Sequence, residues 1–416
     1  MEASLYIHVP FCAGSCDYCD FYSIPLMPSA QRTGDSRLEA YVAALLSDGE
    51  RLFEKFRPDL IPAVYIGGGT PSVLGQAGIR ALLTGILELI LRYAPLPDEI
   101  TVEANPESAD EAFLAAACES GATRLSLGLQ TFNGPSRRAV NRIWPVLNSA
   151  SSQASEPSRD NDETRLTKRL ALTAEYFPGA FSTDLISGLP FQNENILLND
   201  IKTALSFNPA HVSLYALTLE PGTLLAKQNA AKHFLPGCDE ADRLWICGRD
   251  ALEKAGFRQY EVSNFCLEGK ESRHNIRYWR MLNWLALGPA ASGTIINDES
   301  GTGLRYTVPP DVDLWLSGNQ INPWLTPGPF CEELDFHTLI KETLLMGFRY
   351  VEGPDEQLFQ KRFRRSICEC IPKTLEKWKA GFFRNDKNAL TKEGLLFLNS
   401  FLADAFLELD SGLKPE

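Results

Sequence analysis

Six short apolar runs in the N-terminal half alternate with longer stretches whose apolar residues recur at helical spacing. The runs span residues 5–9, 63–67, 99–104, 124–129, 181–186 and 211–217. Their nearly continuous hydrophobicity is typical of parallel strands buried on both faces. The helical stretches between them include residues 38–53, 79–93, 108–120 and 197–207. A strand-then-helix order repeated six times predicts right-handed crossovers and a parallel sheet.

The repeat stops at six units, which favours a six-stranded barrel, open on one side, over an eight-stranded one. We therefore predict an α/β fold with a partial (β/α)6 barrel core over residues 1–235. Residues 236–310 are mixed and aromatic-rich, as expected of a connecting region. Helical patterns dominate residues 311–416, which predicts a smaller, mostly helical C-terminal domain.

One segment after the fourth strand breaks the alternation. Residues 148–164, NSASSQASEPSRDNDET, are serine-rich and nearly devoid of apolar side chains. Such a composition cannot bury enough apolar surface to offset the entropy of ordering. The sequence therefore predicts a disordered surface insertion at this point.

Charge and composition narrow the class of protein. The chain has 40 Lys and Arg against 53 Asp and Glu, a net charge of −13, which argues against nucleic acid as a partner. No basic segment precedes the first strand, and the most apolar stretch, residues 81–96, is interrupted by Glu88 and Arg92. Ten cysteines do not suggest a disulfide scaffold here. We expect a cytoplasmic protein.

Three cysteines, Cys12, Cys16 and Cys19, lie within eight residues directly after the first strand. Structural zinc normally takes four ligands, a redox pair needs only two cysteines, and ordinary ferredoxin clusters take four. Three unrelated thiols in one loop are a further alternative. The spacing favours a [4Fe–4S] cluster in which one iron has no protein ligand.

The segment YIHVPFCAGSCDYCDF, residues 6–21, resembles the radical S-adenosylmethionine superfamily. Within it, the segment is similar to the branch that contains oxygen-independent coproporphyrinogen III oxidase and the HemW heme chaperones, and the resemblance covers most of the chain. It implies that S-adenosylmethionine chelates the open iron and is split to a 5′-deoxyadenosyl radical, while the protein supplies orientation and a dry cavity. It also implies a winged-helix-like C-terminal domain.

Further residues at the ends of the predicted strands match the family's cofactor contacts. The glycines of YIGGGTPS, residues 65–72, allow close backbone approach, although a plain tight turn would also use them. Carboxylates at one rim of a barrel suit a ligand, although an ion pair such as Asp184 with Arg142 is the ordinary alternative. The resemblance implies contacts to S-adenosylmethionine from Tyr6, Tyr18, Gly68, Gly69, Thr70, Glu103, Gln130, Arg142, Asp184 and Thr218.

Two positions bear on the branch of the family. The oxidases have a further cysteine where this chain has Phe21, and the HemW-like proteins lack that cysteine. The second feature is the HNxxYW signature, which the resemblance associates with heme and which here comprises His274, Asn275, Tyr278 and Trp279.

This signature has chemistry suited to heme. Imidazole is a usual axial ligand of heme iron, and Tyr and Trp offer flat apolar surface. We also predict that Arg273, Arg277 and Arg280 pair with the two heme propionates. The ordinary alternative for His274 is a hydrogen-bonded core histidine.

The resemblance thus implies a protein that binds heme and passes it to a membrane-bound acceptor, with an electron donor for its cluster. Coproporphyrinogen III oxidation, or a radical reaction on another substrate, is the alternative. Phe21 and His274 disfavour the oxidase, and no catalytic residue is identified. A zinc-stabilised interaction protein is a third possibility, which the three-ligand site disfavours.

Overall fold

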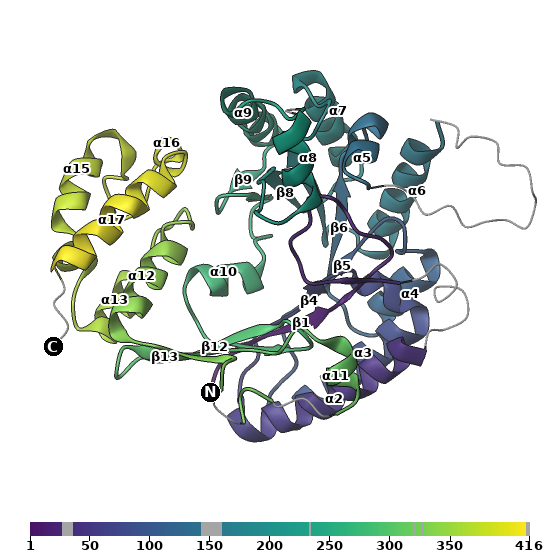
Figure 1. Ribbon diagram of the computed structural model, residues 1–416, viewed down its shortest axis with the longest axis horizontal. Helices are drawn as coiled ribbons and strands as arrows, with labels where there is room; N and C mark the ends of the chain where they lie inside the picture. The colour runs from purple at the N-terminus through teal and green to yellow at the C-terminus, as the bar shows by residue number, and fades with distance from the viewer. Residues whose placement is uncertain (27–35, 143–159, 233, 319–321, 326–327, 413–416) are drawn as a thin grey trace, which may run out of the picture.

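The computed structural model describes residues 1–26, 36–142, 160–232, 234–318, 322–325 and 328–412, and the structural statements below refer to these ranges. A curved sheet with helices on its outer side forms the larger part of the molecule (Figure 1). The C-terminal helices gather beside it. His233, which the sequence places in a polar linker, and most of the predicted insertion lie outside the described residues.

All six predicted strands are present, and each pairs in parallel with the next. They are β1 (Ser4–Val9), β4 (Ala63–Gly68), β5 (Glu99–Ala104), β6 (Arg124–Gln130), β7 (Phe181–Ser187) and β8 (His211–Ala216). The helices that follow are α2 (Ser36–Phe56), α3 (Gly75–Leu91) after the 3-10 turn η1 (Pro71–Leu74), α4 (Glu111–Glu119), α5 (Gly134–Ala139), α6 (Asp160–Tyr176), α7 (Glu194–Leu205), α8 (Leu224–Lys232) and α9 (Cys238–Lys254). The predicted (β/α)6 core is confirmed.

The region between barrel and C-terminal helices extends the same sheet at both edges. Beyond β1 lie β11 (Trp284–Leu287), β12 (Ser292–Asn297), β13 (Thr302–Thr307) and β14 (Cys331–Leu334); beyond β8 lie β10 (Asn264–Cys266) and β9 (Arg258–Gln259). Only β11 among these is parallel to its barrel neighbour. This stretch therefore contributes to the sheet and does more than connect two domains.

The barrel strands are buried along most of their length, as the sequence predicts, and apolar and polar residues alternate along them. One face contributes aliphatic residues to the core under the helices, among them Leu5, Ile7, Val64, Val102, Leu125 and Val212. The alternate positions include Tyr6, His8, Tyr65, Glu103, Asp184 and Ser213. Because strand side chains alternate between faces, these polar groups line the interior of the barrel.

The structure adds detail to the sequence predictions for helices α6 and α3. Helix α6 begins at Asp160, so residues 160–164 of the predicted insertion are helical. By length and composition alone Pro71–Leu91 could cross a membrane, but its Ile79, Leu82 and Ile86 are buried in the core of the barrel.

The C-terminal part has a hydrophobic core of its own, drawn largely from Leu334 to Leu409. Its helices are α12 (Phe336–Gly347), α13 (Glu356–Phe363), α14 (Ile367–Cys370), α15 (Pro372–Phe382), α16 (Lys392–Leu395) and α17 (Leu398–Gly412). The short α11 (Val312–Leu316) and Trp324 pack instead with the barrel core. The predicted helical character of this region is confirmed.

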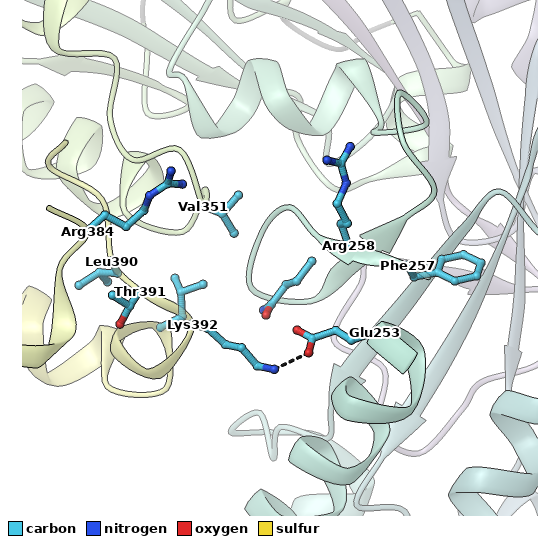
Figure 2. Close-up of a pocket in the computed structure, with 10 residues that line it drawn as sticks. Glu253, Phe257, Arg258, Val351, Arg384, Leu390, Thr391 and Lys392 are labelled. Carbon is cyan, nitrogen blue, oxygen red and sulfur yellow. Dashed lines mark hydrogen bonds and ion pairs between the residues drawn. The ribbon is translucent and has the colours of Figure 1, made fainter. Parts of the chain in front are cut away.

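The barrel and the C-terminal helices enclose a cleft of about 570 Å³ (Figure 2). Phe257 and Arg258 line it from the barrel side, and Arg384 and Lys392 line it from the C-terminal side. Lys392 forms an ion pair with Glu253 of α9 and lies 3.5 Å from Asp250. These charges tie the C-terminal helices to the barrel.

Candidate cofactor and ligand site

The three-cysteine loop leaves β1 at the carboxyl end of the barrel strands. A two-stranded ribbon closes it, in which β2 (Phe11–Cys12) pairs with β3 (Ile24–Pro25). Within the loop the Cys19 N–H donates to the Cys16 carbonyl at 3.1 Å, and the Asp17 N–H donates to the Val140 carbonyl at 3.0 Å. The loop is therefore fixed to itself and to the barrel rim.

An arc of hydrogen bonds joins two of the cysteines through residues that follow β4, β5 and α5. The Cys12 Sγ lies 3.2 Å from the Thr70 Oγ1, which accepts a hydrogen bond of 2.8 Å from Asn105 Nδ2. The Asn105 Oδ1 in turn accepts from Arg142 at 2.8 Å, and the same guanidinium reaches the Cys16 Sγ at 3.5 Å. Asn105 thus orients one hydroxyl and one cation toward two sulfurs.

The chemistry of this loop fits an iron–sulfur cluster. Burial raises the pKa of the Cys12 and Cys19 thiols, which keeps them protonated when no cation is bound. Across the described ranges, no three His, Cys, Asp or Glu side chains stand close enough to hold a single metal ion. A [4Fe–4S] cluster is larger than one ion, and each thiolate binds a different iron. Arg142 and Thr70 supply the hydrogen bonds that cluster sulfurs commonly receive.

The glycines after β4 are required by neighbouring protein atoms. Gly68 has a φ of +104°, and a Cβ there would lie 2.6 Å from the His8 ring. A Cβ on Gly69 would lie 2.6 Å from the Phe11 carbonyl oxygen. These glycines let the turn pack directly against the start of the cysteine loop, so a steric need of the fold explains them.

His8, for which the sequence offers no role, anchors the cysteine loop. Its Nε2 lies 2.9 Å from the Tyr22 carbonyl and its Nδ1 lies 2.9 Å from the Tyr6 hydroxyl. A carbonyl only accepts, so Nε2 carries the proton and Nδ1 accepts from Tyr6. Burial lowers the pKa of His8, which keeps the ring neutral. The imidazole therefore joins β1 to the far end of the loop.

We expect His8→Ala to weaken cluster retention, because two buried hydrogen bonds worth about 1 kcal/mol each are lost at the loop's end. The measurement is the rate at which reconstituted protein loses iron to a chelator under anaerobic conditions. The matched control is His337→Ala, which removes a half-exposed histidine 3.5 Å from Asp410 on the C-terminal helices. Equal rates in the two variants would show that His8 does not hold the loop.

Two carboxylates lie on inner positions of β5 and β7, the strands on either side of β6. Glu103 accepts a hydrogen bond of 2.5 Å from the Tyr65 hydroxyl, and burial raises its pKa to about 7. Asp184 accepts from Ser126 at 3.1 Å, and burial also raises its pKa. The recorded acidic partner of Arg142 is Glu107 at 3.8 Å, so the alternative ion pair between Asp184 and Arg142 does not form in the described structure.

The remaining residues that the resemblance assigns to S-adenosylmethionine are spread around the same rim. Gln130 ends β6 with a φ of +69°, an unusual backbone conformation for a residue other than glycine. Tyr18 packs against the small cluster of Val140, Ile186 and Leu189. Thr218 lies beyond β8 and is exposed, and its hydroxyl donates a hydrogen bond to the Ala216 carbonyl. Its side chain is not brought to the others.

His274 lies on the short helix α10 (Arg273–Trp279), which faces β4 and the C-terminal helix α12. The ring stacks on Tyr65, with centroids 5.0 Å apart and planes at 26°, and meets the edge of Tyr278 at 4.8 Å. It is 2% exposed, and neither ring nitrogen has a hydrogen-bond partner among the described residues. Burial lowers its pKa to about 3. His274 is thus a buried side chain without the hydrogen bonds that the ordinary alternative, a hydrogen-bonded core histidine, would lead us to expect.

The rest of the HNxxYW segment points in different directions. Tyr278 packs on Trp284 with centroids 4.5 Å apart, whereas the Trp279 ring lies under Arg349 at 5.3 Å. The Asn275 side chain hydrogen-bonds to Tyr260. Only His274 and Tyr278 thus adjoin the interior tyrosines.

The three arginines predicted to bind propionates are already engaged. Arg273 pairs with Asp98 at 2.6 Å, Arg280 pairs with Asp355 at 2.7 Å, and Arg277 pairs with Glu2. Each would have to leave a carboxylate before it could bind another. These acidic partners come from distant segments and cannot be read from a local cluster of arginines, and the pairing with propionates stays a prediction.

The chain is similar in sequence to known proteins. Residues 6–204 match the Radical SAM superfamily, the class that a parallel barrel and a three-cysteine loop indicate. The chain is 30% identical to the heme chaperone HemW of Buchnera aphidicola over 96% of this chain and 97% of that protein. It is 33% identical to the mouse mitochondrial radical S-adenosyl methionine domain-containing protein 1, over 86% and 76% of the two chains. It belongs to the HemW family of radical SAM proteins.

A solved structure supports the fold. Coproporphyrinogen III oxidase (HemN) from Escherichia coli superposes with a TM-score of 0.72 over 99% of this chain and 91% of that one. The sequence identity is 18%, so the likeness concerns the fold alone. It covers both the barrel and the helical C-terminal part.

Proposed function

We propose that the chain is a heme chaperone that binds heme and passes it to an acceptor. The observation that carries this proposal is His274, a buried and neutral imidazole with two unpaired nitrogens at the inner side of the barrel. A buried polar group without a partner is costly, and neutral imidazole is a usual ligand of iron. Relatives similar over nearly the full chain are named heme chaperones.

In this proposal Cys12, Cys16 and Cys19 hold one [4Fe–4S] cluster, whose open iron binds S-adenosylmethionine. When bound, the pair supplies one-electron chemistry at the sulfonium. The chain's own part is to exclude water and orient the cofactor. Thr70 and Arg142 hydrogen-bond to the cysteine sulfurs. Glu103 and Asp184 would offer carboxylates to the ammonium and the ribose hydroxyls of the cofactor.

His274 would bind the heme iron, and Tyr278 would offer apolar surface beside it. Because His274 is buried, heme can reach it only if α10 moves or if the rings that cover His274 move. We place the protein in the cytoplasm, with a membrane-bound heme acceptor and an electron donor as its partners and no role for nucleic acid.

Coproporphyrinogen oxidation is the alternative function. Phe21, which is 69% exposed on the cysteine loop, stands where the oxidases have their further cysteine. The fold likeness to HemN does not carry that enzyme's activity to this chain, because many activities share one fold.

The test uses anaerobically reconstituted protein in two parallel assays. With S-adenosylmethionine, a reductant and coproporphyrinogen III, we expect no decarboxylated product. With one equivalent of heme and then an apo-globin, we expect heme to be bound and afterwards recovered in the globin. Decarboxylated product together with no heme binding would overturn the proposal in favour of the oxidase.

The raised pKa of Glu103 predicts a pH dependence of S-adenosylmethionine affinity. Below pH 7 this carboxyl is increasingly protonated and no longer attracts the ligand's ammonium, so the affinity should fall by up to about tenfold per pH unit. Above about pH 8 the affinity should level off. Equilibrium dialysis between pH 6 and 8.5 measures this. The Glu103→Gln variant should bind weakly with a flat profile, and an unchanged slope in it would exclude Glu103 as the titrating group.

A further inference from the structure

Tyr65 touches both halves of the site from one position in the middle of β4. Its hydroxyl donates to the Glu103 Oε1 at 2.5 Å, and its ring stacks on His274 at 5.0 Å. It also stacks on Tyr6, the residue directly opposite on β1, with centroids 6.4 Å apart. No cofactor contact falls on Tyr65 by resemblance, so its place between Glu103 and His274 comes from the structure.

The surroundings are shaped for this contact. A Cβ on Gly67, two residues along the same strand, would lie 2.9 Å from both the Tyr65 ring and the Glu103 carboxyl. Any larger residue there would push the two side chains apart. Glycine at this position therefore lets the hydroxyl and the carboxylate meet.

Three tyrosine rings pack around His274. Neither of its nitrogens has a hydrogen-bond partner in the described structure, so packing against Tyr65, Tyr278 and Tyr6 fixes the plane of the imidazole. Of these three, Tyr65 lies nearest to parallel, at 26°. The orientation of His274 thus depends on where Tyr65 is held, and Tyr65 is held by Glu103.

We propose that Tyr65 is a positioning residue that couples the cofactor carboxylate Glu103 to the heme histidine His274. This inference rests on the proposed function. A ligand ammonium that pairs with Glu103 competes with the Tyr65 hydroxyl for the carboxylate oxygens and so weakens the bond that holds Tyr65. The Tyr65 ring is then held less firmly, and so is the imidazole. S-adenosylmethionine therefore weakens heme binding and favours release.

The experiment is a heme titration of reconstituted protein, with and without saturating S-adenosylmethionine. In the unaltered chain we expect the cofactor to weaken heme binding by about fivefold or more, the usual lower range of coupling between sites. Linkage requires heme to weaken S-adenosylmethionine binding by the same factor. In Tyr65→Phe, which keeps the ring and removes the hydroxyl, both factors should fall toward one. The absorption spectrum of bound heme should also stop responding to the cofactor.

The matched control is Tyr176→Phe, which removes another tyrosine hydroxyl facing a glutamate, the Glu111 of α4 at 3.4 Å. It lies on the outer helices and should keep the full coupling. If the unaltered protein binds heme with no cofactor effect, or if Tyr65→Phe retains the effect, the coupling is refuted while the heme proposal stands. If the unaltered protein binds no heme, the proposed function itself fails.

Discussion

The Cys16→Ser variant is expected to emerge from anaerobic reconstitution without the brown colour of a [4Fe–4S] cluster, as are Cys12→Ser and Cys19→Ser. The loop supplies three thiols and no fourth, so the loss of any one leaves two irons without a thiolate. The loss of the Cys16 sulfur also removes a hydrogen-bond partner of the Arg142 guanidinium, which lies 3.5 Å from that sulfur. Iron and sulfide analysis should fall from roughly four of each per chain to near zero.

The control for this series is Cys368→Ser, an exposed cysteine on the C-terminal helix α14. It should reconstitute like the unaltered chain. Full iron and sulfide in any one of the three loop variants would mean that the cluster has another ligand. If the unaltered chain contains zinc and no sulfide, the chain holds no iron–sulfur cluster.

The His274→Phe variant should separate stability from ligand binding. Phenylalanine keeps a ring for stacking on Tyr65 and removes two buried nitrogens that have no partner. We therefore expect the free energy of unfolding to stay the same or to rise by about 1 kcal/mol. Heme affinity should fall by at least about tenfold, because a metal ligand is lost. Chemical denaturation and heme titration of the same preparation provide both readings.

An opposite result has a clear meaning. If His274→Phe unfolds much more easily than the unaltered chain and binds heme equally well, His274 is a packing residue and the iron ligand lies elsewhere. Asn275→Ala serves as the comparison within the same helix, since its side chain bonds to Tyr260 and not to the interior rings.

The sequence was sufficient for the barrel because each of its six strands is a mostly buried run of five to seven residues, rich in apolar side chains, followed by a helix. The outer strands of the sheet were missed for a physical reason. Strands β9 and β10 are two and three residues long, and β13 is polar and partly exposed, so they leave almost no local pattern. Their position is decided by pairing with distant strands.

The cysteines were predictable because a cluster loop is a local feature. Asn105, His8 and Tyr65 were not, since each acts through a partner far away in the chain: Arg142 for Asn105, Tyr22 for His8, His274 for Tyr65. One signal was available. Polar residues at every second position of the strands mark an interior face that is kept for a ligand.

The most direct measurement is a heme titration of the anaerobically reconstituted protein, with the unaltered chain beside His274→Phe. The account predicts saturable binding of one heme per chain that carries an intact cluster, and binding in the variant that is weaker by at least about tenfold. Binding that does not saturate, or equal affinity in the two proteins, would contradict it. The chain would then be a radical SAM protein whose barrel serves another ligand.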